Sequence, residues 1–94
     1  MAEPAALRVV VTGRVQGVMF RDFTRDQAEA LSLTGYVRNL PGGGAVEVEA
    51  EGERARLEEL LSVVKRGPPR AVVESTSVTW GKYTGIYRDF RIRL

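Results

Sequence analysis

The stretch that decides the fold is residues 7–33, which read LRVVVTGRVQGVMFRDFTRDQAEALSL. In residues 7–12, mostly β-branched side chains alternate between two faces, which predicts a strand with one well-buried face. Gly13 and Gly17 then mark a loop. From Phe20 to Leu33 apolar residues recur about every 3.6 positions, which predicts an amphipathic helix after the strand.

A hairpin is predicted after this helix. Its two strands are residues 36–40 and 45–51, and the turn-forming stretch Pro41-Gly42-Gly43-Gly44 joins them. Apolar and acidic residues alternate in the second strand, so one face is expected to be buried and the other to be wet. The acidic face is made of Glu47, Glu49 and Glu51.

The rest of the chain adds one helix and two strands. Leucine and valine spacing predicts a helix over residues 53–65, which Gly67-Pro68-Pro69 ends. Residues 71–80 favour a strand, and the alternation in residues 90–94 predicts a short last strand at a sheet edge. Residues 1–6 are expected to form a short flexible lead.

This order, β-α-β-β-α-β plus a terminal strand, predicts a fold of the α+β class. Each helix has one apolar face and the sheet has one polar face, so stacking both helices on one side of the sheet buries all apolar surfaces. The expected architecture is a ferredoxin-like two-layer sandwich with an antiparallel sheet. A chain of 94 residues has room for one such core, so we expect residues 1–94 to form a single domain.

Composition excludes several kinds of chemistry. The chain has no cysteine and no histidine, which removes disulfides, thiolate nucleophiles, zinc–sulfur sites and the usual general base near neutral pH. Histidine is also the commonest metal ligand, and we expect no metal site and no cofactor. With 14 basic and 12 acidic residues the net charge is only +2, which suits an anionic ligand but does not by itself indicate nucleic acid.

Targeting features are also missing from the sequence pattern. The first residues lack the positively charged start and apolar core of a secretory signal, and no apolar run approaches membrane-spanning length. We expect a cytoplasmic protein that is monomeric and has no membrane partner.

The loop between the first strand and the first helix is the best candidate for an anion site. A helix start presents unpaired N–H groups, and successive loop amides can form a concave nest around phosphate oxygens. Arg21 in the first helical turn opposes the helix dipole, yet arginine is well suited to binding oxyanions. The alternative interpretation is a connector with two turn glycines and a solvated arginine.

Asn39, the only asparagine, lies late in the strand 36–40. The first strand and this strand are joined through a helix and run parallel, so their carboxyl ends share one edge of the sheet. One strand lies between them, which separates Asn39 from the loop by about 10 Å. Arg21 and Asn39 are therefore expected to reach one small ligand from two sides, although Asn39 is equally suited to hydrogen bonding within the hairpin.

Two motifs resemble those of the acylphosphatase family. Gly13-Arg14-Val15-Gln16-Gly17-Val18-Met19-Phe20-Arg21 is similar to the family's signature loop, and Gly35-Tyr36-Val37-Arg38-Asn39-Leu40-Pro41 is similar to its second motif. The resemblance extends from about Leu7 to Leu94 and includes Val46-Glu47-Val48, Ala50-Glu51-Gly52, Gly67-Pro68-Pro69 and Phe90-Arg91-Ile92.

This resemblance implies a hydrolase that cleaves the carboxyl–phosphate bond of acyl phosphates without a metal. It implies that Arg21 and the loop amides bind the phosphate, and that Asn39 holds the attacking water. The ligands it implies are the acyl phosphate and inorganic phosphate or a similar anion. The loop residues concerned are Arg14, Val15, Gln16, Gly17, Val18, Met19 and Phe20.

Elementary chemistry agrees with that activity. The leaving group is a carboxylate, a weak base that needs no general acid. Phosphoryl transfer passes through a loose transition state, so catalysis is mostly positioning and charge stabilisation, which arginine, amides and a water-orienting asparagine supply without histidine.

Two other functions are compatible with parts of this sequence pattern, an RNA-recognition domain and a non-catalytic phosphate sensor. RNA-recognition domains share this element order, but they stack bases on aromatic residues of the central strands, and residues 46–51 are acidic and contain no aromatic residue, so we expect no nucleic-acid partner. A non-catalytic module that senses phosphate would use Arg21 without turnover. The carboxylates Asp22 and Asp26 are interpreted as helix N-terminal charges beside Arg25, and not as a metal site.

Overall fold

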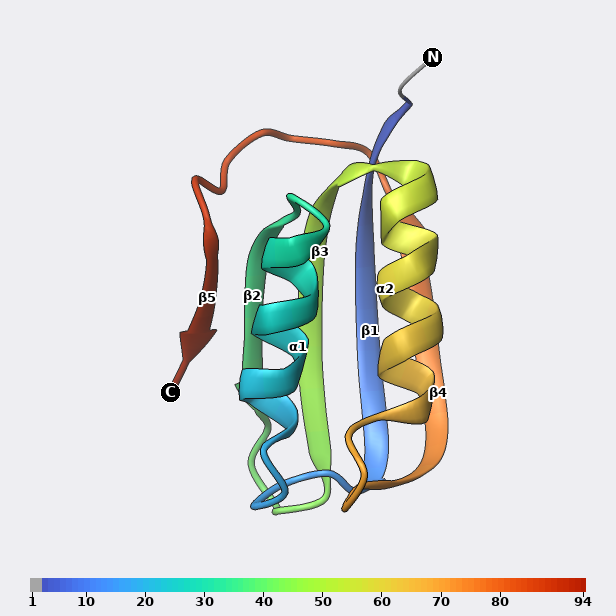
Figure 1. Ribbon diagram of the computed structural model, residues 1–94, viewed down its shortest axis with the longest axis vertical. Coiled ribbons are helices and arrows are strands. Elements are labelled where there is room, and N and C mark those ends of the chain that lie inside the picture. The colour runs from blue at the N-terminus through green and yellow to red at the C-terminus, as the bar shows by residue number, and fades with distance from the viewer. Residues whose placement is uncertain (1–2) are drawn as a thin grey trace.

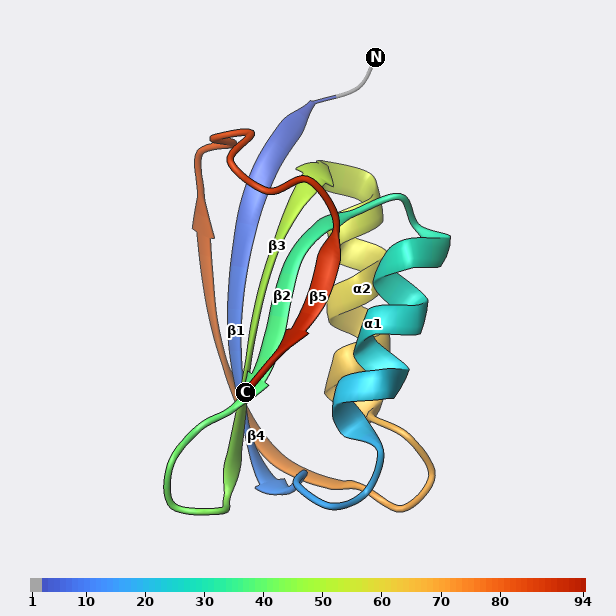
Figure 2. The ribbon, with the colours of Figure 1, turned by 90° about the vertical axis from the view of Figure 1, so that its left-hand side faces the viewer.

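The computed structural model describes residues 3–94, which form a sheet covered on one face by two helices (Figures 1 and 2). The sheet order is β4-β1-β3-β2-β5. The elements are β1 (Pro4–Arg14), α1 (Phe20–Ala30), β2 (Thr34–Asn39), β3 (Ala45–Glu53), α2 (Arg54–Arg66), β4 (Val72–Gly81) and β5 (Phe90–Arg93). This confirms the predicted ferredoxin-like α+β sandwich.

Strand β3 lies at the centre and determines the direction of its neighbours. It pairs antiparallel with β1 on one side and with β2 on the other, so β1 and β2 run parallel with one strand between them. The short strand β5 lies at the edge of the sheet as predicted, but it pairs parallel with β2, so the sheet is mostly and not wholly antiparallel. The carboxyl ends of β1 and β2 therefore lie at the same edge.

The core forms between the helices and the apolar face of the sheet. Leu7 and Val9 of β1 face the helices and pair with Ala50 and Val48 of β3, and all four side chains are buried. The helices add Phe20, Leu57 and Leu60, each at most 2% exposed. The two periodicities found in the sequence thus meet in one layer of apolar side chains.

The flexible lead expected for residues 1–6 is wrong for its described part. Strand β1 begins at Pro4, pairs with β3 from Pro4↔Glu53 onward and buries Ala5. The Arg54 N–H also donates to the Glu3 carbonyl at 2.8 Å. Backbone pairing orders these residues although their side chains show no strand pattern. Residues 1 and 2 lie outside the described part of the chain.

Helix α1 ends earlier than residue 33, where the apolar period places its end. Its last residue is Ala30, and Ser32 takes a positive φ of 57°. The Leu33 N–H returns to the Ala28 carbonyl at 2.9 Å, which closes the helix end and turns Leu33 into the core. Leu31 and Leu33 thus continue the apolar pattern without continuing the helix.

The wet face expected for β3 is also wrong in part, because Glu47 is only 3% exposed. Its carboxylate lies between two strands and accepts hydrogen bonds from Arg8 at 2.8 Å and Arg38 at 2.6 Å. The single hydroxyl hydrogen of Tyr36 is shared between the carboxylates of Glu49, at 2.8 Å, and Glu47, at 3.1 Å. The pKa of the Tyr36 phenol is raised, mostly by burial and next by its hydrogen bonds to Glu49 and Glu47. The hydroxyl therefore keeps its proton and acts as a donor.

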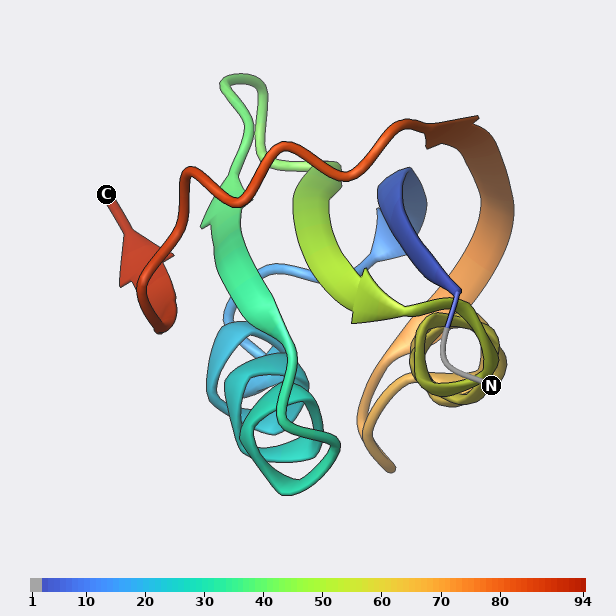
Figure 3. The ribbon, with the colours of Figure 1, turned by 90° about the horizontal axis from the view of Figure 1, so that it is seen from above.

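Glu51 is buried for a different reason. The segment 82–89 crosses the sheet face opposite the helices on its way from β4 to β5 (Figure 3). Glu51, 4% exposed, accepts hydrogen bonds from the N–H groups of Thr84 and Gly85 and from the Thr84 hydroxyl. A carboxylate buried in this way is stable because its oxygens are paired with donors. Glu51 therefore fastens the crossing segment to the sheet.

Gly13 marks the point where β1 leaves its regular pairing with β4. The register shifts between Thr12 and Gly13, and Gly13 has a φ of 132°. A Cβ at this position would lie 2.2 Å from the Val72 carbonyl oxygen. We expect Gly13→Ala to lower the free energy of unfolding by at least about 2 kcal/mol, because the backbone itself must shift.

Urea unfolding followed by the fluorescence of Trp80, the only tryptophan, measures this loss. Gly44→Ala is the matched control, because a Cβ there meets nothing within 4 Å and its φ lies outside the glycine-favouring range. The control is expected to stay within about 0.5 kcal/mol of the wild type. Equal losses in the two variants would show that the close approach at Gly13 does not constrain the fold.

The Glu47 cluster predicts acid sensitivity. Burial alone would raise the pKa of Glu47, but hydrogen bonds from Arg38, Arg8 and Tyr36 outweigh it and lower the pKa below the ordinary value. Glu47 therefore contributes stability above the ordinary carboxyl pKa, and this contribution is lost as the pH falls below about 4.5. At neutral pH we expect Glu47→Gln to cost about 2 kcal/mol, since both arginines stay partly solvated.

Urea titrations between about pH 3 and pH 7 test this pH dependence. The difference in free energy of unfolding between the wild type and Glu47→Gln must become smaller as the pH falls. Glu59→Gln makes the same change at an exposed glutamate of α2. Its free energy of unfolding should differ from that of the wild type by a small amount that does not depend on pH. A Glu47→Gln gap that stays constant with pH would rule out this linkage.

Candidate active site

The loop from Val15 to Met19 carries the chain from β1 into α1. Gly17 has a φ of 72° and Met19, a residue with a side chain, has a φ of 66°. Alternation of right- and left-handed backbone turns successive N–H groups toward one side, which is the geometry of an anion-binding nest. For Met19 this conformation costs about 1 kcal/mol or more, so the surrounding structure must hold it.

The start of α1 offers further donors. No side chain in residues 3–94 caps this helix start, and its first intrahelical hydrogen bond runs from the Phe23 N–H to the Met19 carbonyl at 3.0 Å. The N–H groups before Phe23 are therefore left for another acceptor. Together with the helix dipole they favour an anion at this point.

Arg21 and Asn39 line one cavity of about 180 Å³ beside this helix start. That volume holds several water-sized groups at about 30 Å³ each, enough for a small tetrahedral anion. The strand directions predict that these two residues share one rim, and in the structure both line this cavity. The cavity is lined by Val15, Gly17, Met19, Phe20, Arg21, Asp22 and Asn39.

Neither of these two candidate side chains is engaged elsewhere in the described part of the chain. Within residues 3–94, Arg21 and Asn39 make no ion pair or hydrogen bond through their side chains. Other arginines, such as Arg8, Arg38 and Arg25, pair with carboxylates. An arginine and an amide that are half buried and unpaired in one cavity are available to a ligand.

Asp22 also lines the cavity, although its sequence position predicts only the role of a helix N-terminal charge. As expected, its carboxylate lies near Arg25, at 3.4 Å, and Arg25 also approaches Asp26 at 3.3 Å. The sequence does indicate that Asp22 can line the cavity, because Asp22 directly follows Arg21 in the first turn of α1. Because Asp22 carries a negative charge, it opposes anion binding next to Arg21.

Three members of the predicted loop do not line the cavity. Arg14 is the last residue of β1 and pairs with Val72, and Val18 is buried in the core. The Gln16 side chain leaves the loop and donates to the Leu40 carbonyl at 2.8 Å. For these residues only the backbone amides stay candidates for contact with an anion.

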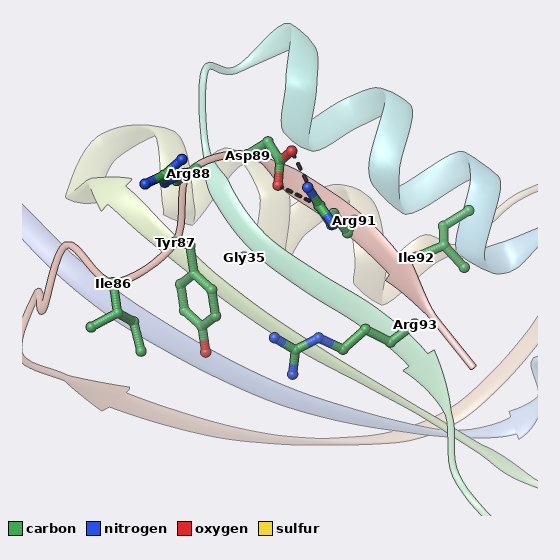
Figure 4. Close-up of a pocket in the computed structure, with 8 residues that line it drawn as sticks. All are labelled: Gly35, Ile86, Tyr87, Arg88, Asp89, Arg91, Ile92 and Arg93. Atoms are coloured by element: carbon green, nitrogen blue, oxygen red, sulfur yellow. Dashed lines mark hydrogen bonds and ion pairs between the residues drawn. The ribbon is translucent and has the colours of Figure 1, made fainter.

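A larger cavity of about 450 Å³ lies along β5 and the segment before it (Figure 4). Its arginines are occupied or divergent: Arg91 donates to Asp89 at 3.0 Å, and Arg93 lies 3.9 Å above the Tyr36 ring. Arg88 points away from the other side chains (Figure 4). These groups do not converge on one point, so size alone does not make this cavity the site.

Two further features bear on the kind of site. Among residues 3–94, no three side chains of the His, Cys, Asp and Glu types are grouped as ligands for a metal ion. The same part of the chain contains no helix with the length and apolar character needed to cross a membrane.

Comparison with known proteins links this geometry to one family. The family model described as Acylphosphatase matches residues 7–92. An acylphosphatase of Dehalococcoides mccartyi is 52% identical over 87 residues, which cover 93% of this chain and 96% of that protein. The crystal structure of an acylphosphatase from Bacillus subtilis superposes with a TM-score of 0.90 at 37% identity, covering 96% of this chain and 99% of that one. An acylphosphatase structure from Coxiella burnetii gives 0.83 at 43% identity, with coverage of 96% and 93%.

The location of Asp22 predicts an effect on anion affinity. Removing its charge by Asp22→Asn should tighten the binding of inorganic phosphate about threefold, because a negative charge near the bound anion disappears. Titration at low salt measures the dissociation constant, and the gain should fade at about 0.5 M salt, where the Debye length is short.

Glu29→Gln is the control for this titration, since it removes an exposed carboxylate from the other end of α1. Its phosphate affinity should match that of the wild type. Weaker binding in Asp22→Asn would contradict an anion site in this cavity.

Proposed function

Because this chain belongs to the acylphosphatase family and is an acylphosphatase, we propose that it hydrolyses acyl phosphates in the cavity between Arg21 and Asn39. The observation that carries the proposal is that a guanidinium and a carboxamide without partners among residues 3–94 line one cavity, at a helix start that none of these residues caps with a side chain. In this proposal the phosphate binds to the Arg21 side chain and to the backbone amides of residues 14–20.

Charge stabilisation falls to Arg21 and the loop amides. The transferring phosphoryl group carries its charge on three equatorial oxygens, and a guanidinium with several fixed N–H groups can contact all of them. Each well-aimed donor lowers the barrier by about 3 kcal/mol. Since the donors are held before the ligand arrives, the site needs little reorganisation during the reaction.

Asn39 orients the attacking water. Its carboxamide has one acceptor and two donor hydrogens, so it can hold a water with a lone pair directed at phosphorus. The new P–O bond forms as the bond between phosphorus and the acyl oxygen breaks, and the carboxylate leaves with the electron pair. A phosphoryl oxygen of the substrate accepts the proton of the water, so the products are a carboxylate and inorganic phosphate.

This scheme needs neither a histidine nor a metal ion. A carboxylate with a pKa near about 4 leaves without protonation. Positive charge comes from Arg21, and the donors come from the main chain. We therefore propose that hydrolysis is metal-independent, and that a chelator leaves the rate unchanged.

Spectrophotometric hydrolysis of benzoyl phosphate tests the proposal. We expect Arg21→Ala to lower kcat/KM about 1,000-fold or more, because Arg21 is the only cation among residues 3–94 that lines the cavity. We expect Asn39→Ala to lower kcat about 100-fold with a small change in KM, because it removes water positioning and not phosphate binding.

Arg88→Ala is the matched control, since Arg88 is exposed and lies just before β5, whose first residue pairs with Gly35 at the end of β2 opposite to Asn39. It should keep wild-type kinetics, and addition of EDTA to the wild type should change nothing. Purified wild-type protein that leaves benzoyl phosphate at its spontaneous rate of hydrolysis would overturn the proposed function.

A further inference from the structure

The side chain of Gln16 connects the loop to the hairpin that carries Asn39. Its single amide nitrogen, Nε2, donates to the Leu40 carbonyl and to the Ala45 carbonyl, each at 2.8 Å. These acceptors lie 24 and 29 residues away in the sequence. No other side chain in residues 3–94 hydrogen-bonds to the main chain of the hairpin residues 40–45.

The two carbonyls belong to the place where the hairpin closes. Asn39 forms the last pair of the β2–β3 ladder, opposite Val46. Leu40 follows directly, and its N–H donates to the same Ala45 carbonyl at 3.0 Å. Gln16 therefore holds the backbone at the residue that follows β2, Leu40, and at the first residue of β3, Ala45.

A second contact ties the same parts together. The Gly13 N–H donates to the Gly44 carbonyl at 3.1 Å. The loop is thus attached to the hairpin at its start by main chain and in its middle by Gln16. The turn between these contacts contains Gly42 and Gly43, where a Cβ would meet nothing within 4 Å, so packing does not hold the turn.

The amide group of glutamine suits this task. One nitrogen with two hydrogens can serve two carbonyl acceptors, whereas a carboxylate offers acceptors only and a thioether has no donor. Gln16 also contributes its backbone to the loop that is proposed to hold the phosphate. One residue therefore spans the two parts of the site whose separation matters for the reaction.

We propose that Gln16 is a positioning residue for hydrolysis: its side chain fixes the end of β2, and with it Asn39, relative to the phosphate-binding loop. This inference rests on the proposed function. Gln16 acts through the direction of the water that Asn39 holds, and its side chain does not touch the phosphate. Misplacing a catalytic group by about 1 Å can cost about 100-fold in rate, so a contact of this kind should be visible in kcat.

Gln16→Met removes both donors and keeps the length of the side chain. Relative to the wild type, we expect kcat for benzoyl phosphate to fall between about tenfold and 100-fold. The inhibition constant of inorganic phosphate should change less than about threefold, because Arg21 and the loop amides are retained. Gln27→Met, the same change at the other glutamine of the chain, should leave both quantities unchanged.

A double-mutant cycle separates positioning from a merely structural role. In the Asn39→Ala background, measured by single turnover with excess enzyme, Gln16→Met should change the rate less than about twofold, because the group it positions is gone. A loss as large as in the wild-type background would overturn the proposal, and so would an unchanged kcat in Gln16→Met alone.

A measurement on the wild-type protein covers the case in which Gln16→Met does not fold. Scalar couplings across the hydrogen bonds, from the Gln16 side-chain nitrogen to the carbonyl carbons of Leu40 and Ala45, should be detectable by NMR with phosphate bound. Their absence would overturn the inference. Because wild-type turnover and the Asn39→Ala loss are measured independently, failure of the Gln16 experiments leaves the proposed function standing.

Discussion

The constraint on which the whole structure depends is that β3 hydrogen-bonds to β1 and β2 at the same time. Antiparallel pairing on both sides makes β1 and β2 parallel and brings their carboxyl ends to one edge. The loop that follows β1 and the asparagine that ends β2 are distant in sequence but are held one strand apart. Every contact of the candidate site, including the link through Gln16, follows from this arrangement.

Much of this arrangement was predictable from local patterns. The alternation of Leu7, Val9 and Val11 and the helical spacing of Leu57, Leu60 and Val64 each fix a buried face, and the structure buries all six side chains. Short connections then leave few ways to stack two helices on one sheet. The glycine loop and Asn39 could be placed on a shared rim because strand direction alone determines which ends meet.

The burial of Glu47 and Glu51 and the contacts of Gln16 were not predicted from the sequence, because they depend on partners distant in the chain. Glu47 has the pattern of a solvent-exposed residue, and only Arg8 from β1 and Arg38 from β2 make its burial favourable. Glu51 is buried because the segment 82–89 returns across the sheet. The partners of Gln16 are backbone carbonyls, which carry no side-chain signal, so no residue pattern indicates that contact.

The candidate site breaks local rules that the rest of the fold obeys. A cation in the first turn of α1, a left-handed Met19 and a helix start that no side chain of residues 3–94 caps each reduce stability. Burial of Val15, Val18 and Phe20 and the two contacts with the hairpin offset that cost, because they hold the loop from below and from the side. Within residues 3–94 the Arg21 guanidinium pairs with no carboxylate and no side chain caps the first N–H groups of α1, and an oxyanion could supply both missing interactions. In the proposed function, a fold that leaves these groups unpaired while fixing the backbone around them is organised for an anion before the anion binds.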